Sequence, residues 1–406
     1  MIYLMLVIFM QTTTQRRLSR NIWLYGGMKV FTKRVFLPLV AIYLVDVGGL
    51  RLNQIAILAT LFAVVSIIAE VPTGYFADRI TRKASLTMSA LFLMAMSSLF
   101  AFSPSFTGAV FATIFEAIGY AFLRGAAEAL IHDTLVLQNR ASNYTKIVAR
   151  AQSIGLVGNI ILVSIVSLTY KINPQMPFII SIFLYASLFI LARNLYEPPR
   201  DKQYISSSSM DLFASMRLFV TKETGLAFLV IGLLSGFNNG STSFTNLAIK
   251  NLGISPGLFG MVFSAGSGAA VIMSIYAGRL RKMSLKHYQL LDLILVVGFI
   301  FGIGITQNLY FAIPAFIVST GFWRLRNIVY QHHLLDMFPG TQNKATLIST
   351  LSFFGRMNEV WIPLVFGYTI GVIGYSKGFV YLSVGFTIIL IPMIFYANRK
   401  KVIDLT

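Results

Sequence analysis

The sequence predicts an all-α membrane protein with twelve transmembrane helices in two pseudo-symmetric six-helix bundles. Three observations lead to this fold class: a high apolar content, regularly spaced apolar segments, and polar positions that repeat between the two halves. Of the 406 residues, 56% are hydrophobic and 12% are charged, and the mean hydropathy is +0.74. A soluble chain of this composition could not cover its surface with polar groups, so we expect a lipid bilayer around it.

Charged or Pro/Gly-rich breaks separate twelve apolar segments, each close to the roughly 20 residues that span a bilayer. The predicted spans are residues 22–45, 53–74, 84–103, 107–131, 145–170, 177–195, 224–249, 256–278, 287–307, 309–331, 345–372 and 375–397. An even number of spans places both termini on one side. Met1–Met10 is apolar but too short to span, it lacks the features of a signal peptide, and Met10 is an alternative translation start.

Basic residues gather on one side of the predicted spans. This side carries Arg16, Arg17, Arg20, Arg79, Arg82, Lys83, Arg140, Lys146, Arg193, Arg200, Lys202, Arg217, Lys222, Arg279, Arg281, Lys282, Lys286, Lys344, Arg399, Lys400 and Lys401. The opposite side carries Arg51, Lys171, Lys250 and Lys377. Because cytoplasmic loops are enriched in Lys and Arg, we expect both termini in the cytoplasm and the protein in the plasma membrane.

The chain divides at its longest polar connection, which contains Pro198-Pro199 and the serines at 206–209. Such a composition is typical of a flexible linker, in which Asp211–Phe219 could form an amphipathic surface helix. The predicted domains are a cytoplasmic tail at 1–20, a six-helix bundle at 21–196, a linker at 197–222, a second six-helix bundle at 223–398 and a cytoplasmic tail at 399–406.

A shift of the sequence by 200 positions aligns polar and glycine residues of the two bundles. The matched positions are Ala77-Asp78-Arg79 with Ala277-Gly278-Arg279, Phe122 with Phe322, Arg124 with Arg324, His132 with His332, Gly155 with Gly355, and Asn159 with Glu359. This pattern favours a duplicated six-helix unit, an arrangement in which two halves rock about a site near the membrane midplane.

The connection between the second and third predicted spans reads Gly-Tyr-Phe-Ala-Asp-Arg-Ile-Thr-Arg-Lys over residues 74–83, and a weaker copy follows at 277–282. This motif resembles the loop between the second and third helices of the major facilitator superfamily, and the resemblance extends over nearly the whole chain. Thr81 and Gly278 depart from the family pattern, and the fifth span has no Gly-Pro motif of drug/proton antiporters. The resemblance implies transport by alternating access and a gating role for Gly74, Asp78, Arg79, Arg82, Arg124 and Glu128.

Several charged residues fall inside the predicted spans, where an ionised group is expensive and usually faces a cavity or a partner. Lys33 and Arg34 lie deep in the first span. Lys29 is four residues before Lys33 and is expected to share a helical face with it, although Lys29 could reach the surface by snorkelling. Glu116 lies about 15 Å into the fourth span at helical rise, near the midplane. An ion pair of Glu116 with Lys33 would be either structural or a proton or substrate switch, because burial disfavours the charged carboxylate.

The second bundle offers further polar candidates at comparable depth. Arg356 and Glu359 lie three residues apart in the eleventh span and could pair within a helix. Of Arg324 and Arg326 in the tenth span, one is expected to face the cavity and the other the linker or headgroups. The predicted substrate or proton pathway comprises Lys33, Arg34, Glu116, Asn159, Asn238, Asn239, Arg324, Arg356 and Glu359.

Other function classes find no support in the sequence. The chain has no cysteine, no Ser/His/Asp arrangement, no Walker-type loop and no metal signature, so we expect neither catalysis nor a cofactor. Its net charge of +19 follows membrane topology rather than a nucleic-acid surface. We expect a monomer whose partners are a small-molecule substrate, protons and the lipid bilayer.

The leading hypothesis is a secondary transporter that exports a small anionic or zwitterionic organic compound or drug in exchange for protons. The basic residues near the midplane favour such a substrate over a lipophilic cation. Proton-coupled uptake of a nutrient is the alternative, since one fold supports both directions. A membrane receptor or lipid-handling protein is a third hypothesis, for which the midplane residues would be dispensable.

Overall fold

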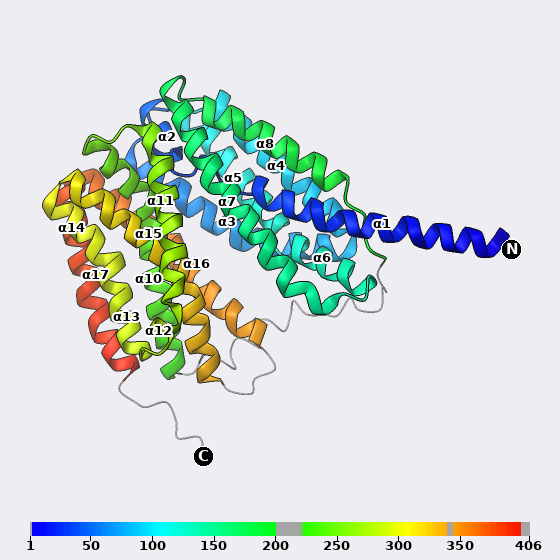
Figure 1. Cartoon of the computed structure of the whole chain (residues 1–406). Helices are drawn as coiled ribbons and strands as arrows, with labels where there is room; N and C mark the ends of the chain where they lie inside the picture. The colour runs from blue at the N-terminus through cyan, green and yellow to red at the C-terminus, as the bar shows by residue number, and fades with distance from the viewer. Residues whose placement is uncertain (1, 200–219, 221, 339–343, 399–406) are drawn as a thin grey trace, which may run out of the picture. The chain divides into compact units, whose positions relative to one another are not determined.

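The structure is a computed structural model that describes residues 2–199, 220, 222–338 and 344–398 (Figure 1). All regular secondary structure in this part of the chain is helical, as the composition predicts. Several predicted features lie outside the described residues. They are the surface helix Asp211–Phe219, most of the linker, the tail 399–406, and Arg200, Lys202, Arg217, Arg399, Lys400 and Lys401.

Contacts divide the chain into two units. The first comprises Met1–Leu37 and Val64–Ser206, and the second comprises Pro38–Ala63 and Ser207–Thr406. Residues 38–63 thus group with the second unit, although the predicted boundary puts them in the first bundle. The predicted domain boundaries otherwise stay a prediction.

The first unit is built from long helices that lie alongside one another (Figure 1). Its α4 packs on α5 and α8, and its α1 packs on α7. The helices are α1 (Ile2–Phe31), the later part of α3 (Leu52–Arg79), α4 (Arg82–Phe102), α5 (Phe106–Leu123), α6 (Ala126–Leu137), α7 (Tyr144–Leu168) and α8 (Met176–Arg193), with short 3-10 turns at Ala141–Asn143 and Thr169–Lys171.

In the second unit the main helix pairs are α10 with α16, α11 with α15, and α14 with α17. The helices are α2 (Val40–Asp46), the first part of α3, α10 (Lys222–Asn251), α11 (Phe259–Ile275), α12 (Ala277–Arg281), α13 (Leu285–Leu293), α14 (Phe299–Thr306), α15 (Leu309–Met337), α16 (Lys344–Ile373) and α17 (Tyr375–Ala397). A 3-10 turn at Pro256–Leu258 precedes α11, and the π-helix η5 (Ile294–Gly298) joins α13 to α14.

Each predicted span coincides with one helix or with consecutive helices, so the all-α membrane fold is confirmed. Among the described residues, eight helical segments are long and apolar enough to cross a membrane by composition alone. The other four predicted spans are the broken α1–α2 segment, α10, α15 and α16. These four segments contain most of the polar candidates of the sequence, from Lys33 and Arg34 in the break after α1 to Asn239 on α10 and Glu359 on α16, whereas Glu116 and Asn159 lie on α5 and α7.

In the first and fourth predicted spans the helix is interrupted well before the span ends. The first span breaks between Phe31 and Val40, around Pro38, which lacks an N–H donor and clashes with the preceding turn of a helix. The fourth span breaks at Arg124-Gly125, where Gly125 has a φ of 74°, a conformation that glycine adopts at little cost. The prediction that Lys29 and Lys33 share a helical face is therefore wrong, because α1 ends at Phe31.

The charged motif is mostly helical, since α3 continues through Pro72 to Arg79 and α4 starts at Arg82. Only Ile80 and Thr81 lie between them, so the predicted loop from Gly74 onward is shorter than expected. Thr81 caps α4 by accepting a hydrogen bond from the backbone N–H of Ala84 at 2.9 Å. Glu197 accepts two more from the N–H groups of Arg82 (3.0 Å) and Lys83 (2.8 Å), where an anion also suits the helix dipole.

Residues 38–63 group with the second unit through direct contacts. Thr60 donates a hydrogen bond to the carbonyl of Val360 at 2.7 Å. One turn earlier in α3, a Cβ on Gly367 would lie 2.4 Å from Ala56, so α3 and α16 approach closely there. Lys250 at the end of α10 pairs with Asp46 at the end of α2, at 2.5 Å.

Glycines let α10 and α16 pack backbone to backbone. Gly232, Gly236 and Gly240 lie at four-residue spacing on one face of α10, the pattern typical of close helix pairs in membranes. A Cβ on Gly236 would lie 2.6 Å from the Cβ of Asn358, and one on Gly240 would lie 2.9 Å from Ile362. This close approach sets the register between the two helices and brings Asn239 opposite Glu359.

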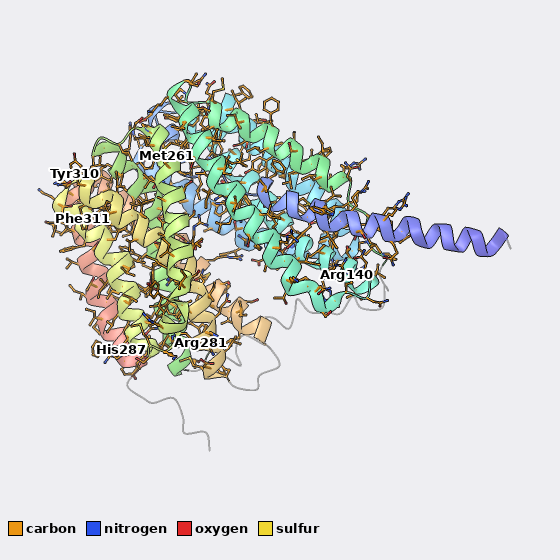
Figure 2. All side chains as sticks on the ribbon, viewed as in Figure 1. Arg140, Met261, Arg281, His287, Tyr310 and Phe311 are labelled. Carbon is orange, nitrogen blue, oxygen red and sulfur yellow. The ribbon has the colours of Figure 1, made fainter. Side chains whose placement is uncertain are left out.

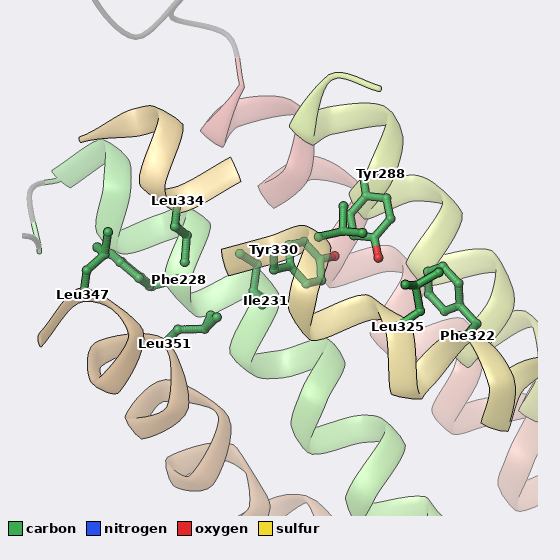
Figure 3. Close-up of a cluster of buried hydrophobic side chains, with 10 residues drawn as sticks. Phe228, Ile231, Tyr288, Phe322, Leu325, Tyr330, Leu334, Leu347 and Leu351 are labelled. Carbon is green, nitrogen blue, oxygen red and sulfur yellow. The ribbon is translucent and has the colours of Figure 1, made fainter. Parts of the chain in front are cut away.

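The apolar core of the second unit surrounds one end of α10 (Figure 3). Phe228 and Ile231 on α10 lie among side chains from α13, α15 and α16, which come together in Figure 3. The labelled partners are Tyr288, Phe322, Leu325, Tyr330, Leu334, Leu347 and Leu351. The hydroxyls of Tyr288 and Tyr330 enter this core and need polar partners there.

We predict that Gly236→Ala destabilises the protein by about 1–3 kcal/mol, because the added methyl forces α10 away from α16. The measurement is thermal unfolding of the purified protein in detergent, followed by tryptophan fluorescence. Gly371→Ala on α16 is the matched control, since its Cβ would meet no atom within 4 Å. Equal unfolding temperatures for the two variants would contradict the close-packing interpretation.

Candidate functional site

A polar cluster occupies the interior of the first unit. The Arg34 side chain leaves the broken segment after α1, and its Nε lies 3.2 Å from Oε1 of Glu116 on α5. The guanidinium also lies over the Tyr120 ring, 4.2 Å from the centroid. Glu116 is 8% exposed. The structure thus places Arg34, the neighbour of the expected Lys33, against this carboxylate.

Tyrosines extend this cluster toward α8. The hydroxyl of Tyr120 lies 3.1 Å from that of Tyr185, so one donates to the other. The chain Glu116–Arg34–Tyr120–Tyr185 joins a carboxylate, a guanidinium and two phenols within the interior of one unit. Such a connected set can shift hydrogen bonds when the charge on any member changes.

A cavity of 380 Å³ adjoins this cluster on the side of α6 and α7. It is bordered by Lys29, Lys33, Arg124 and Glu128, and Tyr120 belongs to both the cavity and the cluster. Lys29 forms an ion pair with Glu128. Two of the predicted gating residues, Arg124 and Glu128, therefore line this cavity.

In the second unit, Glu359 on α16 accepts a hydrogen bond from Nδ2 of Asn239 on α10. Asn238 donates to Asn239 Oδ1 at 3.4 Å, so the two amides and the carboxylate form one row. The indole N–H of Trp361 donates to Asn358 Oδ1 at 3.1 Å. The sequence identified Asn239 and Glu359 separately, and the glycine-mediated packing of α10 on α16 brings them together.

An ion pair in the second unit was missed by the sequence reasoning. Arg326 on α15 and Asp292 on α13 both have 0% exposed side chains, and Nε lies 2.7 Å from Oδ2. Arg326 also donates to Ser235 Oγ at 2.7 Å and to the Ile231 carbonyl at 3.3 Å, while Tyr330 donates to Asp292 at 2.8 Å. An acidic residue inside the predicted span 287–307 was the signal that could have revealed Asp292.

The remaining predicted pathway residues lie elsewhere. Arg324 is exposed, two residues from the buried Arg326, so Arg326 is the arginine that faces the interior of α15. Asn159 and Arg356 are half-buried on α7 and α16. Their part in a pathway stays a prediction.

The predicted gating residues are separated in the structure. Gly74, Asp78 and Arg79 are exposed on the last turns of α3. Arg82 pairs with Asp133 on α6, and Arg124 lies 3.8 Å from Glu70 on α3. The sequence identified the basic members of this charge network but did not name Asp133 or Glu197 as their partners.

Comparison with known proteins shows which family the chain is similar to. A family model described as Major Facilitator Superfamily matches residues 22–357. An uncharacterized MFS-type transporter, YxaM, from Bacillus subtilis (strain 168) is 23% identical over 389 residues, covering 94% of this chain and 95% of the relative.

Solved structures share the fold at low sequence identity. The crystal structure of nucleoside transporter NupG has a TM-score of 0.73 and 13% identity, covering 96% of this chain and 100% of that chain. A bacterial homolog of the human lysosomal transporter Spinster, in an inward-facing and unoccupied conformation, has a TM-score of 0.69 and 14% identity, covering 96% and 97%.

We predict that Asp292→Asn destabilises the protein by about 3–5 kcal/mol, because it leaves the buried Arg326 guanidinium without a counter-charge. Arg326→Gln should cost a similar amount for the converse reason. The double variant should lose less than the sum of the two, which a double-mutant cycle of unfolding measurements checks.

Arg324→Gln serves as the matched control for this cycle. It removes the same charge from the same helix at an exposed position, so its unfolding temperature should stay close to that of the wild type. Additive effects of Asp292→Asn and Arg326→Gln would contradict direct coupling between the two side chains.

Proposed function

Because the chain belongs to the major facilitator superfamily, we propose that it is a secondary transporter working by alternating access that exports a small anionic or zwitterionic organic compound in exchange for protons. No chemical conversion of the substrate is part of this function. Its membrane is the plasma membrane, and both termini lie in the cytoplasm.

One observation carries the proposal: each unit holds a carboxylate deep in a predicted span with a polar partner from another segment of the chain. Glu116 contacts Arg34 in the first unit, and Glu359 contacts Asn239 in the second. Inside a bilayer, a carboxylate is stabilised either by such partners or by binding a proton. Protonation of the carboxylate would weaken its interaction with Arg34 or Asn239 and leave that side chain able to move. In the proposed mechanism, this release couples proton binding to transport.

The substrate class follows from the sign of the charges near these carboxylates. Arg34 contacts Glu116, Lys33 is the residue next to Arg34 in the chain, and Arg356 lies three residues before Glu359 on α16. Several basic side chains in a low-dielectric interior favour an anionic group and disfavour a lipophilic cation. The fold itself does not set the direction of transport, since the same architecture serves import and export.

The proposed orientation is supported by the distribution of basic residues. Figure 2 shows Arg281 and His287 at one end of the helices of the second unit and Met261 and Tyr310 at the opposite end. The end with Arg281 also carries Arg279, Lys282 and Lys286. Under the positive-inside rule this end faces the cytoplasm.

The charged residues that join α3, α4 and α6 are proposed to stabilise one conformational state. Arg82 ties the start of α4 to Asp133 on α6, and Glu197 caps the same helix start. Arg124, 3.8 Å from Glu70, links α3 to the connection between α5 and α6. Breaking these interactions would let the ends of α3, α4 and α6 move relative to one another.

Function and direction are tested by a substrate screen on cells that lack the gene, with and without an uncoupler. Export predicts that deletion raises accumulation of the substrate and that the uncoupler abolishes the difference between deleted and wild-type cells. Lower accumulation in the deleted cells would instead indicate uptake. Unchanged accumulation across anionic and zwitterionic compounds would contradict transport of this substrate class.

For the coupling residues, we predict that Glu116→Gln and Glu359→Gln each reduce proton-driven transport at least ~10-fold, since neither amide can bind and release a proton. Proteoliposomes with an imposed pH gradient and the substrate from the screen provide the measurement. Asp336→Asn, which changes an exposed carboxylate near the end of α15, is the control and should transport normally. Full proton-driven transport by both glutamine variants would refute the assignment.

A further inference from the structure

The residues that line the cavity of the first unit indicate the chemical class of ligand that it could bind. Its 380 Å³ falls within the range of roughly 300–1,000 Å³ that small-molecule sites occupy. Arg124 and Gln152 are exposed, so the cavity can be reached from outside the unit. The lining residues are Tyr25, Met28, Lys29, Thr32, Lys33, Tyr120, Leu123, Arg124, Gly125, Ala127, Glu128 and Gln152.

The charges that line the cavity are unequal. Three basic side chains, Lys29, Lys33 and Arg124, and one carboxylate, Glu128, line the cavity, so the net charge of the lining is +2; Glu70, outside the lining, lies 3.8 Å from Arg124. Glu128 forms an ion pair with Lys29, whose ammonium group also lies over the Tyr25 ring, 4.9 Å from the centroid. A cavity of this net sign attracts an anion and repels a cation.

The backbone that carries Lys29 is held rigidly by small residues on α7. A Cβ on Gly155 would lie 2.7 Å from the carbonyl oxygen of Lys29, and one on Gly158 would lie 2.7 Å from Val30. The two helices therefore touch through backbone and small side chains, which fixes the position of this part of α1. Because the backbone of this cationic segment is already fixed, binding an anion there would cost less conformational entropy.

The uncharged part of the lining is mostly apolar or aromatic, with Thr32 and Gln152 as its polar members. Met28, Leu123 and Tyr120 supply a surface for a ring or a short hydrocarbon body. Tyr120 has its hydroxyl engaged with Tyr185 and its ring face engaged with Arg34, so it connects the cavity to Glu116. Two side chains, Tyr120 and Arg34, would therefore connect a ligand in the cavity to the proposed coupling carboxylate Glu116.

We propose that this cavity binds the anionic group of a small aromatic organic acid, with Lys33 and Arg124 contacting the anion and Tyr120 and Leu123 contacting the ring. The assignment rests on the proposed transport function and names its substrate class. Glu128 acts in it as an internal competitor, because it occupies Lys29 in the absence of ligand. Binding of the acid redistributes Lys29 between the Glu128 carboxylate and the ligand.

The test measures equilibrium binding of radiolabelled benzoate to the full chain in phosphatidylcholine nanodiscs, without a pH gradient. Benzamide, which matches benzoate in shape and lacks its charge, should bind at least ~10-fold more weakly. Lys33→Gln and Arg124→Gln should each weaken benzoate binding about 10-fold, whereas Lys171→Gln, a basic residue outside the cavity, should not.

Glu128→Gln should change the affinity for benzoate in the opposite direction from Lys33→Gln and Arg124→Gln. Removal of the competing carboxylate should tighten benzoate binding about 3- to 10-fold, while a purely structural ion pair would only lower the stability of the protein. Folding of every variant is checked by size-exclusion chromatography and thermal unfolding. If Glu128→Gln does not fold, Lys33→Gln and Arg124→Gln still decide the outcome.

Three results would overturn the proposal. Equal affinities for benzoate and benzamide would remove the role of charge, and unchanged binding by both Lys33→Gln and Arg124→Gln would remove the site. Displacement of benzoate by phosphatidylglycerol in the nanodisc would assign the cavity to a lipid headgroup. Since binding is measured without a gradient, loss of benzoate binding leaves proton-driven transport of another substrate intact, and loss of coupling leaves this binding intact.

Discussion

An ionised side chain inside a bundle of apolar helices needs a compensating partner, because neither lipid nor hydrocarbon side chains can hydrogen-bond to it. This constraint explains why the interior charges of the two units come with arginine, asparagine or tyrosine partners. Arg34 contacts Glu116 and Tyr120, and Arg326 contacts Asp292 and Ser235. Each arrangement joins helices that are distant in sequence, so a polar requirement also determines which helices pack together.

The two arginine clusters differ in what they permit. Arg326 and Asp292 have no exposed side-chain surface and are surrounded by the apolar core of Phe228, Ile231 and Tyr330. A pair enclosed in this way resists any change of charge and suits a fixed scaffold of α10, α13 and α15. Arg34 keeps 25% of its side chain exposed and adjoins a cavity through Tyr120, so its contacts can respond to a ligand or a proton.

The sequence predicted the spans well because the length and apolarity of a membrane helix are local properties. It predicted the breaks and the pairings poorly, since these depend on tertiary structure. Pro38 and Gly125 interrupt spans whose overall hydropathy gives no sign of it. Asp292 and Arg326 lie 34 positions apart, and the sequence contains no local pattern that relates them. From its depth in the predicted span, Lys33 was expected to contact Glu116, but the structure shows this contact for its neighbour Arg34. Which of the two side chains points toward Glu116 depends on the path of the backbone through the break after α1.

In the proposed mechanism, the cavity and the Arg34 cluster together would link substrate binding to protonation of Glu116. Tyr120 contacts both: its ring lies against Arg34, which holds Glu116, and the same side chain lines the cavity. An anion in the cavity would lower the local positive potential, weaken the hold of Arg34 on Glu116, and so favour protonation of that carboxylate. Substrate and proton would then bind cooperatively at this site, as a symporter requires. In an exporter that exchanges substrate for protons, the substrate and the proton must instead bind in different conformational states. Exchange would therefore depend on the charged contacts at the ends of α3, α4 and α6, which are proposed to stabilise one of those states.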